Sequence, residues 1–174
     1  MQTSKIENAV LCLVNAERGN LPPLVRYRSL GAIGIPLARA ASKHVTAAIA
    51  LKWWGRVTPG KDCRPIRDNP RLCDPHINPQ TGSTPGSRAE AEGYGRNCRE
   101  SYVAENTYAG WGGNKASPRA AVEWWMNSQL HKATILDPKY RELYTIVTLG
   151  SADPDAGSVS PAASYVQMFG VCTK

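Results

Sequence analysis

Apolar residues recur at helical spacing in several segments of the chain, and two of these segments lie in its first third. Residues 4–18 carry apolar side chains three and four positions apart, and Ser4 with Glu7 forms a capping-box pattern at their start. Residues 37–54 are rich in alanine and follow Pro36, which suits the first turn of a helix. The pattern predicts one helix in each segment.

Two further helices are predicted from their starting residues. In "TPGSRAEAEGY", Thr84 is placed to cap a short helix whose first residue is Pro85. The stretch "ASPRAAVEWWMNSQLH" repeats this pattern with Ser117 and Pro118, and its spacing continues to His131. We therefore expect four helices, the last of them continuous from its proline to His131.

Three later segments are rich in β-branched and aromatic residues, which is typical of strands. They are "SYVAENTYAG" around Val103, residues 143–149 and residues 165–169. The loop between the last two suits a loose antiparallel connection. Because helices come mostly first and strands late, without a βαβ rhythm, the pattern predicts an α+β fold with a small antiparallel sheet covered by helices.

Composition indicates a folded, loop-rich protein. The chain has 174 residues, 42% hydrophobic and 20% charged, with 15 glycines and 13 prolines. We expect one domain over residues 1–174. No stretch reaches the roughly 18 to 20 apolar residues that a membrane span needs, so no transmembrane segment is expected. The first residues lack the features of a signal peptide, so an exported protein would correspond to this chain in its mature form.

The net charge of +7 favours encounters with anionic surfaces. Nucleic acid is not the expected partner, because the basic residues are scattered. The one dense run, "GKDCRPIRDNPRLCDP", has no interleaved aromatic residues on which bases could stack.

Five cysteines suggest disulfides in an oxidising compartment. None of them forms a C-x-x-C pair, which argues against a zinc ribbon or a thioredoxin-like motif. Cys63 and Cys73 bracket the basic run, where a bridge would tie down a segment with few apolar residues. The sequence alone leaves fifteen combinations of pairing open, and one thiol stays free in any monomer; the five residues are Cys12, Cys63, Cys73, Cys98 and Cys172.

Two of the three histidines lie before residue 80. His44 falls within the second expected helix with no carboxylate or cysteine at helical spacing, so we interpret it as a packing or surface histidine. His76 lies in the loop "CDPHINPQTGSTPG", where polar and turn residues on both sides give it no packing role. It is either a solvated loop histidine or part of a site.

The third histidine, His131, ends the last expected helix. At 100° per residue, Trp124, Ser128 and His131 share one face with Ala121, while Trp125 belongs to a second apolar face. Two apolar stripes predict a helix buried on two sides. We expect one side to pack into the core and the other to border a cavity into which Ser128 and His131 project.

Several motifs in order resemble the CAP superfamily, or SCP domain, and its bacterial branch in particular. They are "LVNAERGNLPPL", "HINPQTGSTPGSR", "AENTYAG", "AVEWWMNSQLHKATILDP" and "YVQMFG". The stretch "WMNSQLHKATIL" resembles the family's W-M-N-S-P-G-H-R-A-N-I-L, and Q-L replaces P-G before the histidine. The resemblance covers a core of about residues 9–170, with an enlarged loop at about residues 55–75.

The resemblance implies a three-layer α-β-α sandwich with a cleft lined by a His, Glu, Glu, His tetrad. His76 matches the first histidine, Glu105 of "AEN" the first glutamate, and His131 the last histidine, while Ser128 stands at the position of the second glutamate. Two imidazoles and one carboxylate are ligands of the type that hold Zn²⁺ with an open fourth position, and they also suit Cu²⁺ or Ni²⁺. The alternative is a hydrogen-bonded network of His76, Glu105 and His131 that needs no ion.

The resulting hypothesis is a secreted or cell-envelope binding protein that is not an enzyme. Its cleft, formed by His76, Glu105, Ser128 and His131, would accept an apolar small molecule or a cell-envelope component, with a divalent metal such as zinc as an option. The family's known partners include sterols, fatty acids and proteins. Four tryptophans are candidates for lining the groove, namely Trp53, Trp54, Trp111 and Trp124. Trp125 is expected in the core, and a core position is also the alternative for Trp124.

Two alternatives remain open. A secreted hydrolase of peptides or envelope components could use Ser128, His131 and Glu105 as a triad, although no G-x-S-x-G elbow and no oxyanion hole can be recognised. A disulfide-stapled surface module could act only through its exterior loops. Replacing the cleft residues separates these readings, because only the hydrolase has turnover to lose.

Overall fold

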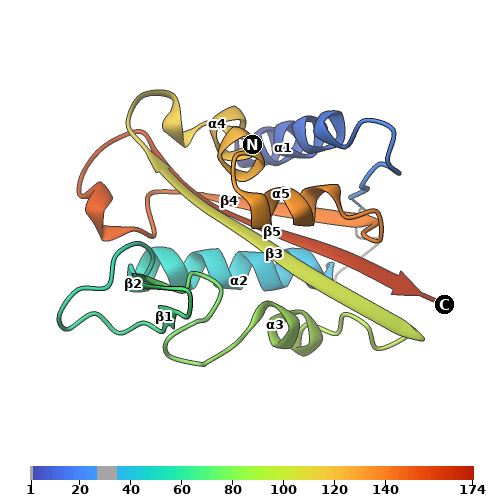
Figure 1. Ribbon diagram of the computed structural model, residues 1–174, viewed down its shortest axis with the longest axis horizontal. Coiled ribbons are helices and arrows are strands. Elements are labelled where there is room, and N and C mark those ends of the chain that lie inside the picture. Colours follow the sequence, from blue (N-terminus) through green and yellow to red (C-terminus); the bar gives the residue numbers. More distant parts are fainter. Residues whose placement is uncertain (1, 27–34) are drawn as a thin grey trace.

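The protein consists of three layers, with a sheet between two groups of helices (Figure 1). The computed structural model describes residues 2–26 and 35–174. The elements are α1 (Gln2–Arg18), α2 (Pro36–Leu51), β1 (Pro65–Ile66), β2 (Asn69–Cys73), α3 (Pro85–Ala91), β3 (Glu100–Trp111), η1 (Gly113–Ala116), α4 (Pro118–Met126), α5 (Gln129–Leu136), β4 (Glu142–Leu149), η2 (Pro154–Ala156) and β5 (Ala162–Thr173).

The central sheet has three antiparallel strands in the order β3-β5-β4. β5 lies in the middle and pairs with β3 along its whole length, so that Glu105 stands opposite Met168. Strands β3 and β4 form the two edges. The α+β class is confirmed, and so are the three expected strands, each longer than its apolar pattern alone indicated.

Each face of the sheet has its own hydrophobic core. Helices α1, α4 and α5 lie on one side of the sheet in Figure 1, and α2 and α3 lie on the other. The first core includes Trp125 and Phe169, and the second includes Trp53 and Met168. Adjacent residues of β5 therefore face opposite cores, as the alternation along a strand requires. The three-layer sandwich implied by the resemblance is confirmed.

The predicted helix starts at residues 85 and 118 are confirmed by their caps. Thr84 accepts a hydrogen bond from the Ser87 N–H, while the Ser87 side chain accepts from the Thr84 N–H, which completes a capping box. Ser117 accepts from the Ala120 N–H at the start of α4. These signals are local, so they could be recognised without knowledge of the fold.

The bounds of the first two helices differ from the expected ones. α1 begins at Gln2, two residues before the expected cap at Ser4. α2 ends at Leu51 and not at Trp54, because Lys52 adopts the left-handed conformation with φ 56° and its N–H donates to the Ala48 carbonyl. Trp54 is thereby released from the helix.

The expected continuous helix from Pro118 to His131 is wrong. The chain forms two helices, and Ser128 between them has an extended backbone with φ −107° and ψ 122°. The break changes which side chains share a face. Trp124 is 49% exposed, although Ala121, expected on the same face, is fully buried.

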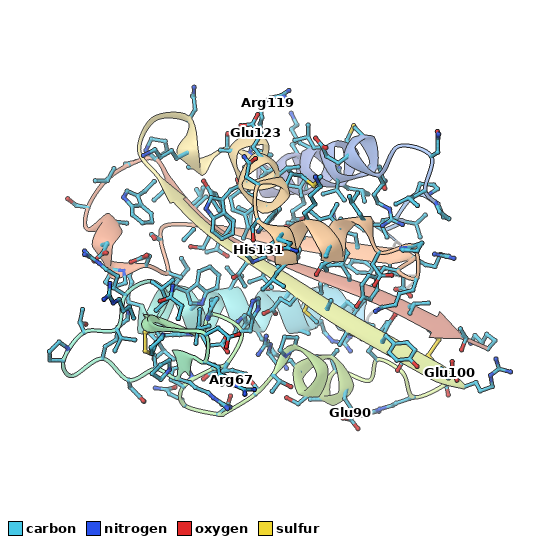
Figure 2. The ribbon with its side chains drawn as sticks, viewed as in Figure 1. Arg67, Glu90, Glu100, Arg119, Glu123 and His131 are labelled. Atoms are coloured by element: carbon cyan, nitrogen blue, oxygen red, sulfur yellow. A yellow bond between two sulfur atoms is a disulfide. The ribbon has the colours of Figure 1, made fainter. Side chains whose placement is uncertain are left out.

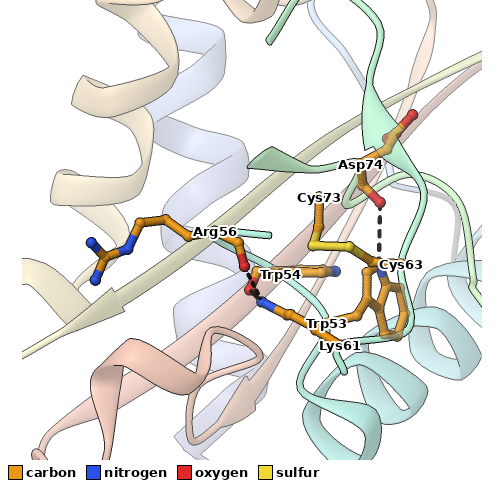
Figure 3. The surroundings of a disulfide bond; sticks show 7 residues. All are labelled: Trp53, Trp54, Arg56, Lys61, Cys63, Cys73 and Asp74. Carbon is orange, nitrogen blue, oxygen red and sulfur yellow. Dashed lines mark hydrogen bonds between the residues drawn. A yellow bond between two sulfur atoms is a disulfide. The ribbon is translucent and has the colours of Figure 1, made fainter. Parts of the chain in front are cut away.

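The structure contains two disulfides, whose pairing the sequence left open. Cys63–Cys73 closes the short antiparallel hairpin of β1 and β2 (Figure 3), and Cys98–Cys172 ties the start of β3 to the end of β5. Cys12 is free and exposed on α1. The bridge considered between Cys63 and Cys73 is thus present. The two strands of the hairpin were not expected.

Among the described residues, no helix is long and apolar enough to cross a membrane.

Candidate functional site

A pocket of about 550 Å³ lies along β3, the edge strand of the central sheet. One wall comes from the segment that contains the disulfide-closed hairpin, and the other comes from α4 and α5. The lining residues are Trp54, Gly55, Ile66, Leu72, Cys73, Asp74, Pro75, His76, Glu105, Asn106, Thr107, Tyr108, Ala109, Trp111, Trp124, Leu130, His131, Thr134 and Asp153. The volume is within the usual range for small-molecule sites.

The hairpin wall is held in place by hydrogen bonds around the disulfide (Figure 3). The Trp53 indole N–H donates to the Asp74 carbonyl at 3.2 Å. The Lys61 ammonium donates to the carbonyls of Trp54 and Arg56 at 2.6 and 2.9 Å. These contacts satisfy loop carbonyls that β1 and β2 do not pair, so a segment of low apolar content keeps one shape beside the pocket.

Glu105 is the buried centre of the polar network in this pocket. Alternation along β3 directs it to the same side as Val103 and Ala109, which pack against the core of α2. Its carboxylate is fully buried. Oε1 accepts a hydrogen bond from His76 Nδ1 at 2.9 Å, and Oε2 accepts from the Arg88 guanidinium at 2.7 Å. Both oxygens therefore have charged or polar partners, as a buried carboxylate requires.

Arg88 connects this network to the loop that carries His76. Besides its ion pair with Glu105, its guanidinium donates to the His76 carbonyl at 3.0 Å and to the Ser83 carbonyl at 2.8 Å. Arg88 lies on α3 and is itself buried. One side chain thus fixes both ends of the loop between residues 76 and 83 against the strand.

His44 lies beneath the same carboxylate. It is 1% exposed, and its Nε2–H donates to the Pro75 carbonyl at 2.8 Å, while Nε2 is 3.7 Å from Glu105 Oε1. Its Nδ1 is buried and has no hydrogen-bond partner among the described residues. Burial lowers the pKa of His44, which keeps the ring neutral.

The charges of His76 and Glu105 stabilise each other. Burial works against the charged form of His76, but the hydrogen bond to Glu105 and the negative charges of Glu105 and Asp74 outweigh it and raise the pKa of His76. Burial also opposes the charge of Glu105, yet the bond from His76 and the positive Arg88 lower the pKa of Glu105. The pair therefore favours an imidazolium facing a carboxylate.

His131 has a different environment on the opposite wall. It lies at the start of α5 where the helix passes over β3 (Figure 2). Its Nδ1 is hydrogen-bonded to Ser128 Oγ at 2.7 Å, and its ring lies 4.9 Å from that of Trp124. Burial and the nearby His76 lower its pKa to about 4, so the ring is neutral at pH 7.

The structure places the four expected site residues as two pairs. His76 contacts Glu105, and His131 contacts Ser128. Three of the four line the common pocket, whereas Ser128 does not and reaches it only through His131. Ser128 occupies the N-cap position of α5 without a capping hydrogen bond of its side chain, because its hydroxyl is bonded to the imidazole instead.

Arg88 and His44 are parts of the network that the sequence did not reveal. Arg88 stands 17 positions before Glu105, and the interpretation of His44 considered only partners on its own helix. His44 is a buried packing histidine as expected, but it also contacts the site. A signal was present for Arg88, because it stands next to the buried Ala89 on a short helix, where an arginine needs a buried acceptor.

The aromatic residues divide between pocket and core. Trp54, Trp111 and Trp124 line the pocket as expected, while Trp53 is fully buried in the core beneath it. Trp125 is fully buried, and its indole N–H donates to the Thr107 carbonyl at 2.9 Å. The alternative that placed Trp124 in the core is wrong, since nearly half of that residue is exposed.

The geometry does not fit the expected metal site of His76, Glu105 and His131. Among the described residues, no three His, Cys, Asp or Glu side chains are grouped so that they could hold a metal ion. The arginine at 2.7 Å from Glu105 Oε2 already supplies a positive charge, and His76 Nδ1 occupies the other oxygen. A cation could bind this carboxylate only by displacing the His76 hydrogen bond or by approaching the positive guanidinium of the arginine.

The Ser128 and His131 pair also departs from a hydrolytic triad. In such a triad the imidazole bonds the serine through one nitrogen and a carboxylate through the other. Within residues 2–26 and 35–174, no carboxylate is hydrogen-bonded to His131, because Glu105 is held by His76 and Arg88. A ring with a pKa of about 4 is a weak base.

Comparisons with known proteins identify the fold. No family model matches the chain, and no curated protein matches it significantly. An extracellular protein containing an SCP domain from Bacillus anthracis is similar over 99% of this chain and 41% of its own, with a TM-score of 0.62 and 19% identity. An outer surface protein from Borrelia burgdorferi matches 99% of this chain and 97% of its own, with a TM-score of 0.63 and 15% identity.

A cysteine-rich secretory protein from Staphylococcus aureus matches 97% of this chain and 38% of its own, with a TM-score of 0.53 and 16% identity. The chain thus spans about two fifths of the length of the Bacillus and Staphylococcus proteins. These similarities show that the chain adopts the fold of the SCP domain, that is, of the bacterial CAP superfamily.

Proposed function

We propose that this chain with the SCP-domain fold is a secreted or cell-envelope-associated binding protein, and that the pocket along β3 holds an apolar or cell-envelope ligand without chemical conversion. The observation that carries the proposal is the pocket itself. It is lined by the aromatic rings of Trp54, Trp111 and Trp124, while Glu105, its most buried charge, is already paired. Such a lining favours burial of apolar surface over acid-base work.

Location outside the cytosol is supported by two observations. The chain has two disulfides, which persist in oxidising compartments. The structures with the same fold are named as extracellular, outer-surface or secretory proteins. A divalent metal is not part of the proposal, because the carboxylate that would bind it is occupied by His76 and Arg88.

The binding proposal can be tested with the uncharged, fluorescent apolar probe 6-propionyl-2-(dimethylamino)naphthalene (prodan). We expect saturable binding to the folded protein and at least a fivefold weaker affinity in Trp124→Ala, because the exposed indole at the pocket wall is removed. Tyr102→Ala is the matched control, since Tyr102 is an exposed aromatic residue outside the pocket. Equal loss in both variants, or no saturable binding at all, would contradict the proposal.

A second candidate function, hydrolysis of peptides or esters, is favoured by one contact. Ser128 Oγ lies 2.7 Å from His131 Nδ1, close enough for proton transfer. The test is turnover of p-nitrophenyl acetate and of a casein digest, with Ser128→Ala and His131→Ala as controls. Turnover that disappears in both variants would establish the hydrolase and displace the binding proposal.

A further inference from the structure

The pocket follows the free edge of β3. Five consecutive residues, 105–109, line it. Side chains in a strand alternate between the two faces of the sheet, so a pocket on one face would touch only every second residue. A pocket that touches all five must run along the edge of the strand, between the two helical layers. No strand in the described part of the chain pairs with this edge, since β5 occupies the other side of β3.

The hydrogen-bond register shows which backbone groups point into the pocket. The Gly112 N–H donates to the Pro161 carbonyl at 2.8 Å, which continues the pairing of β3 with β5. Because hydrogen-bonded and non-bonded positions alternate in an antiparallel pair, the even-numbered residues of β3 bond to β5. The odd-numbered residues Glu105, Thr107 and Ala109 direct their N–H and C=O groups to the free edge.

An independent contact agrees with this register. The Thr107 carbonyl accepts the Trp125 indole N–H at 2.9 Å, which requires that carbonyl to point away from β5. Apart from this bond, the described residues provide no hydrogen-bond partner outside the sheet for the edge-directed N–H and C=O groups of Glu105, Thr107 and Ala109. Main-chain donors and acceptors spaced two residues apart suit another extended chain.

We infer that the ligand of this pocket is an extended peptide segment that binds beside β3 as an additional strand. This inference rests on the proposed binding function and specifies the class of ligand. Residues 105–109 offer about 14 Å of strand edge, at roughly 3.4 Å per residue, so the core of the bound segment is about five residues long.

Side chains of the bound segment meet two apolar walls. A strand beside β3 directs successive side chains alternately to the hairpin side and to the helix side. Trp54 and Leu72 line the first wall, and Trp124 and Leu130 line the second. Leu130 is 80% exposed and Trp124 is 49% exposed, so both have apolar surface left to bury.

Charge complementarity specifies the segment further. The residues that line the pocket in the described part of the chain include the carboxylates of Asp74, Glu105 and Asp153 but no lysine or arginine. Glu105 is paired with Arg88, and a protonated His76 offsets one of the two remaining carboxylates, Asp74 and Asp153, so the groove stays acidic on a protein whose net charge is +7. The segment that fits is apolar at most positions and carries at least one lysine or arginine.

The test selects binders from a displayed library of random octapeptides on the whole chain, and it measures selected synthetic peptides by fluorescence anisotropy. We expect enriched peptides with apolar and basic residues that compete with prodan. The decisive measurement uses analogues N-methylated at alternate residues. Methylation of the residues whose N–H groups face β3 should weaken binding at least tenfold, and methylation of the intervening residues less than threefold.

A protein variant tests the same edge. In Ala109→Pro the edge-directed N–H is lost, while the bonds of Tyr108 and Gly110 to β5 remain, since proline is tolerated at an edge strand whose N–H faces outward. We expect peptide affinity to fall at least tenfold more than in Ala109→Ser, which keeps the N–H. Thermal unfolding establishes that both variants fold, and the N-methyl series on the unmodified protein does not depend on either variant.

The outcomes separate the two proposals. Prodan binding without any enriched peptide, or peptide binding equally sensitive to both methylation sets, overturns the added strand and leaves the binding function intact. Absence of both prodan binding and peptide binding at the pocket overturns both proposals. Sensitivity confined to one methylation set, together with the Ala109→Pro effect, supports the inference.

Discussion

Two histidines on opposite walls of one pocket have pKa values that are shifted in opposite directions. His76 donates to the buried Glu105, and this bond with the surrounding negative charge raises the pKa of His76 despite its burial. His131 is bonded to the uncharged Ser128 hydroxyl, and burial lowers the pKa of His131 to about 4. The surroundings of each imidazole therefore decide the direction in which its pKa shifts.

This difference also distinguishes a pocket wall that stabilises the fold from a pocket wall that is available to a ligand. The His76 side is a closed network in which Arg88 and Glu105 fix a loop to the sheet. The His131 side is a neutral, partly exposed surface beside Trp124. We therefore expect substitutions on the first side to affect stability most and substitutions on the second to affect ligand affinity most.

The largest expected effect is on the His76 side. Glu105→Ala leaves Arg88 buried without its carboxylate and His76 without its acceptor, so the free energy of unfolding should fall by about 3 to 5 kcal/mol. Urea denaturation measures the change. Glu100→Ala is the control, because Glu100 is exposed at the far end of the same strand (Figure 2) and should change stability by less than about 0.5 kcal/mol. A similar change in the free energy of unfolding for the two variants would contradict the structural role assigned to the His76 wall.

A smaller effect is expected on the His131 side. Ser128→Ala removes one hydrogen bond from a neutral ring that water can reach. The free energy of unfolding should therefore fall by only about 0.5 to 1.5 kcal/mol. The same urea titration provides the comparison with Glu105→Ala. A loss as large as that of Glu105→Ala would show that the Ser128–His131 pair is as structural as the ion-paired network.

The two histidines should also give opposite slopes of stability with pH. The folded pKa of His131 is about 4, below its unfolded value near 6.5, so its contribution to stability is lost as pH falls from 6.5 towards 4. The folded pKa of His76 is raised, so its contribution is present below pH 6.5 and is lost as pH rises.

Two glutamine variants measure these slopes. The stability difference between the parent protein and His131→Gln should shrink on acidification from pH 7 to 4. The stability difference between the parent and His76→Gln should instead grow as pH falls from 8 to 6. Each slope should stay below about 1.4 kcal/mol per pH unit. Slopes of the same sign for both variants would refute the opposite directions of the two pKa shifts.

The sequence predicted those features that depend on neighbouring residues. Thr84 and Ser117 marked two helix starts correctly because a cap needs only the residues three positions ahead. The break at Ser128 was missed, since the apolar spacing continues across it while the hydroxyl bonds the His131 ring. β1 and β2 were missed because the hairpin carries few apolar residues and is closed by Cys63–Cys73.

The residue types of the site could be predicted from the sequence, but their hydrogen-bond and ion-pair partners could not. Motif order identified His76, Glu105 and His131, and the structure brings all three to one pocket. Arg88 was not anticipated, because its partner lies 17 positions away on another element. That arginine changes the chemistry, since it occupies the carboxylate that was expected to be available for a metal.

The most direct test of the proposed binding pocket is the response of the five tryptophan indole N–H signals in ¹H–¹⁵N spectra during a prodan titration. We predict the largest shifts for Trp54 and Trp124, which line the pocket, and the smallest for Trp53, whose N–H is bonded to the Asp74 carbonyl in the core. Saturable prodan binding that leaves the Trp54 and Trp124 signals in place would contradict the account.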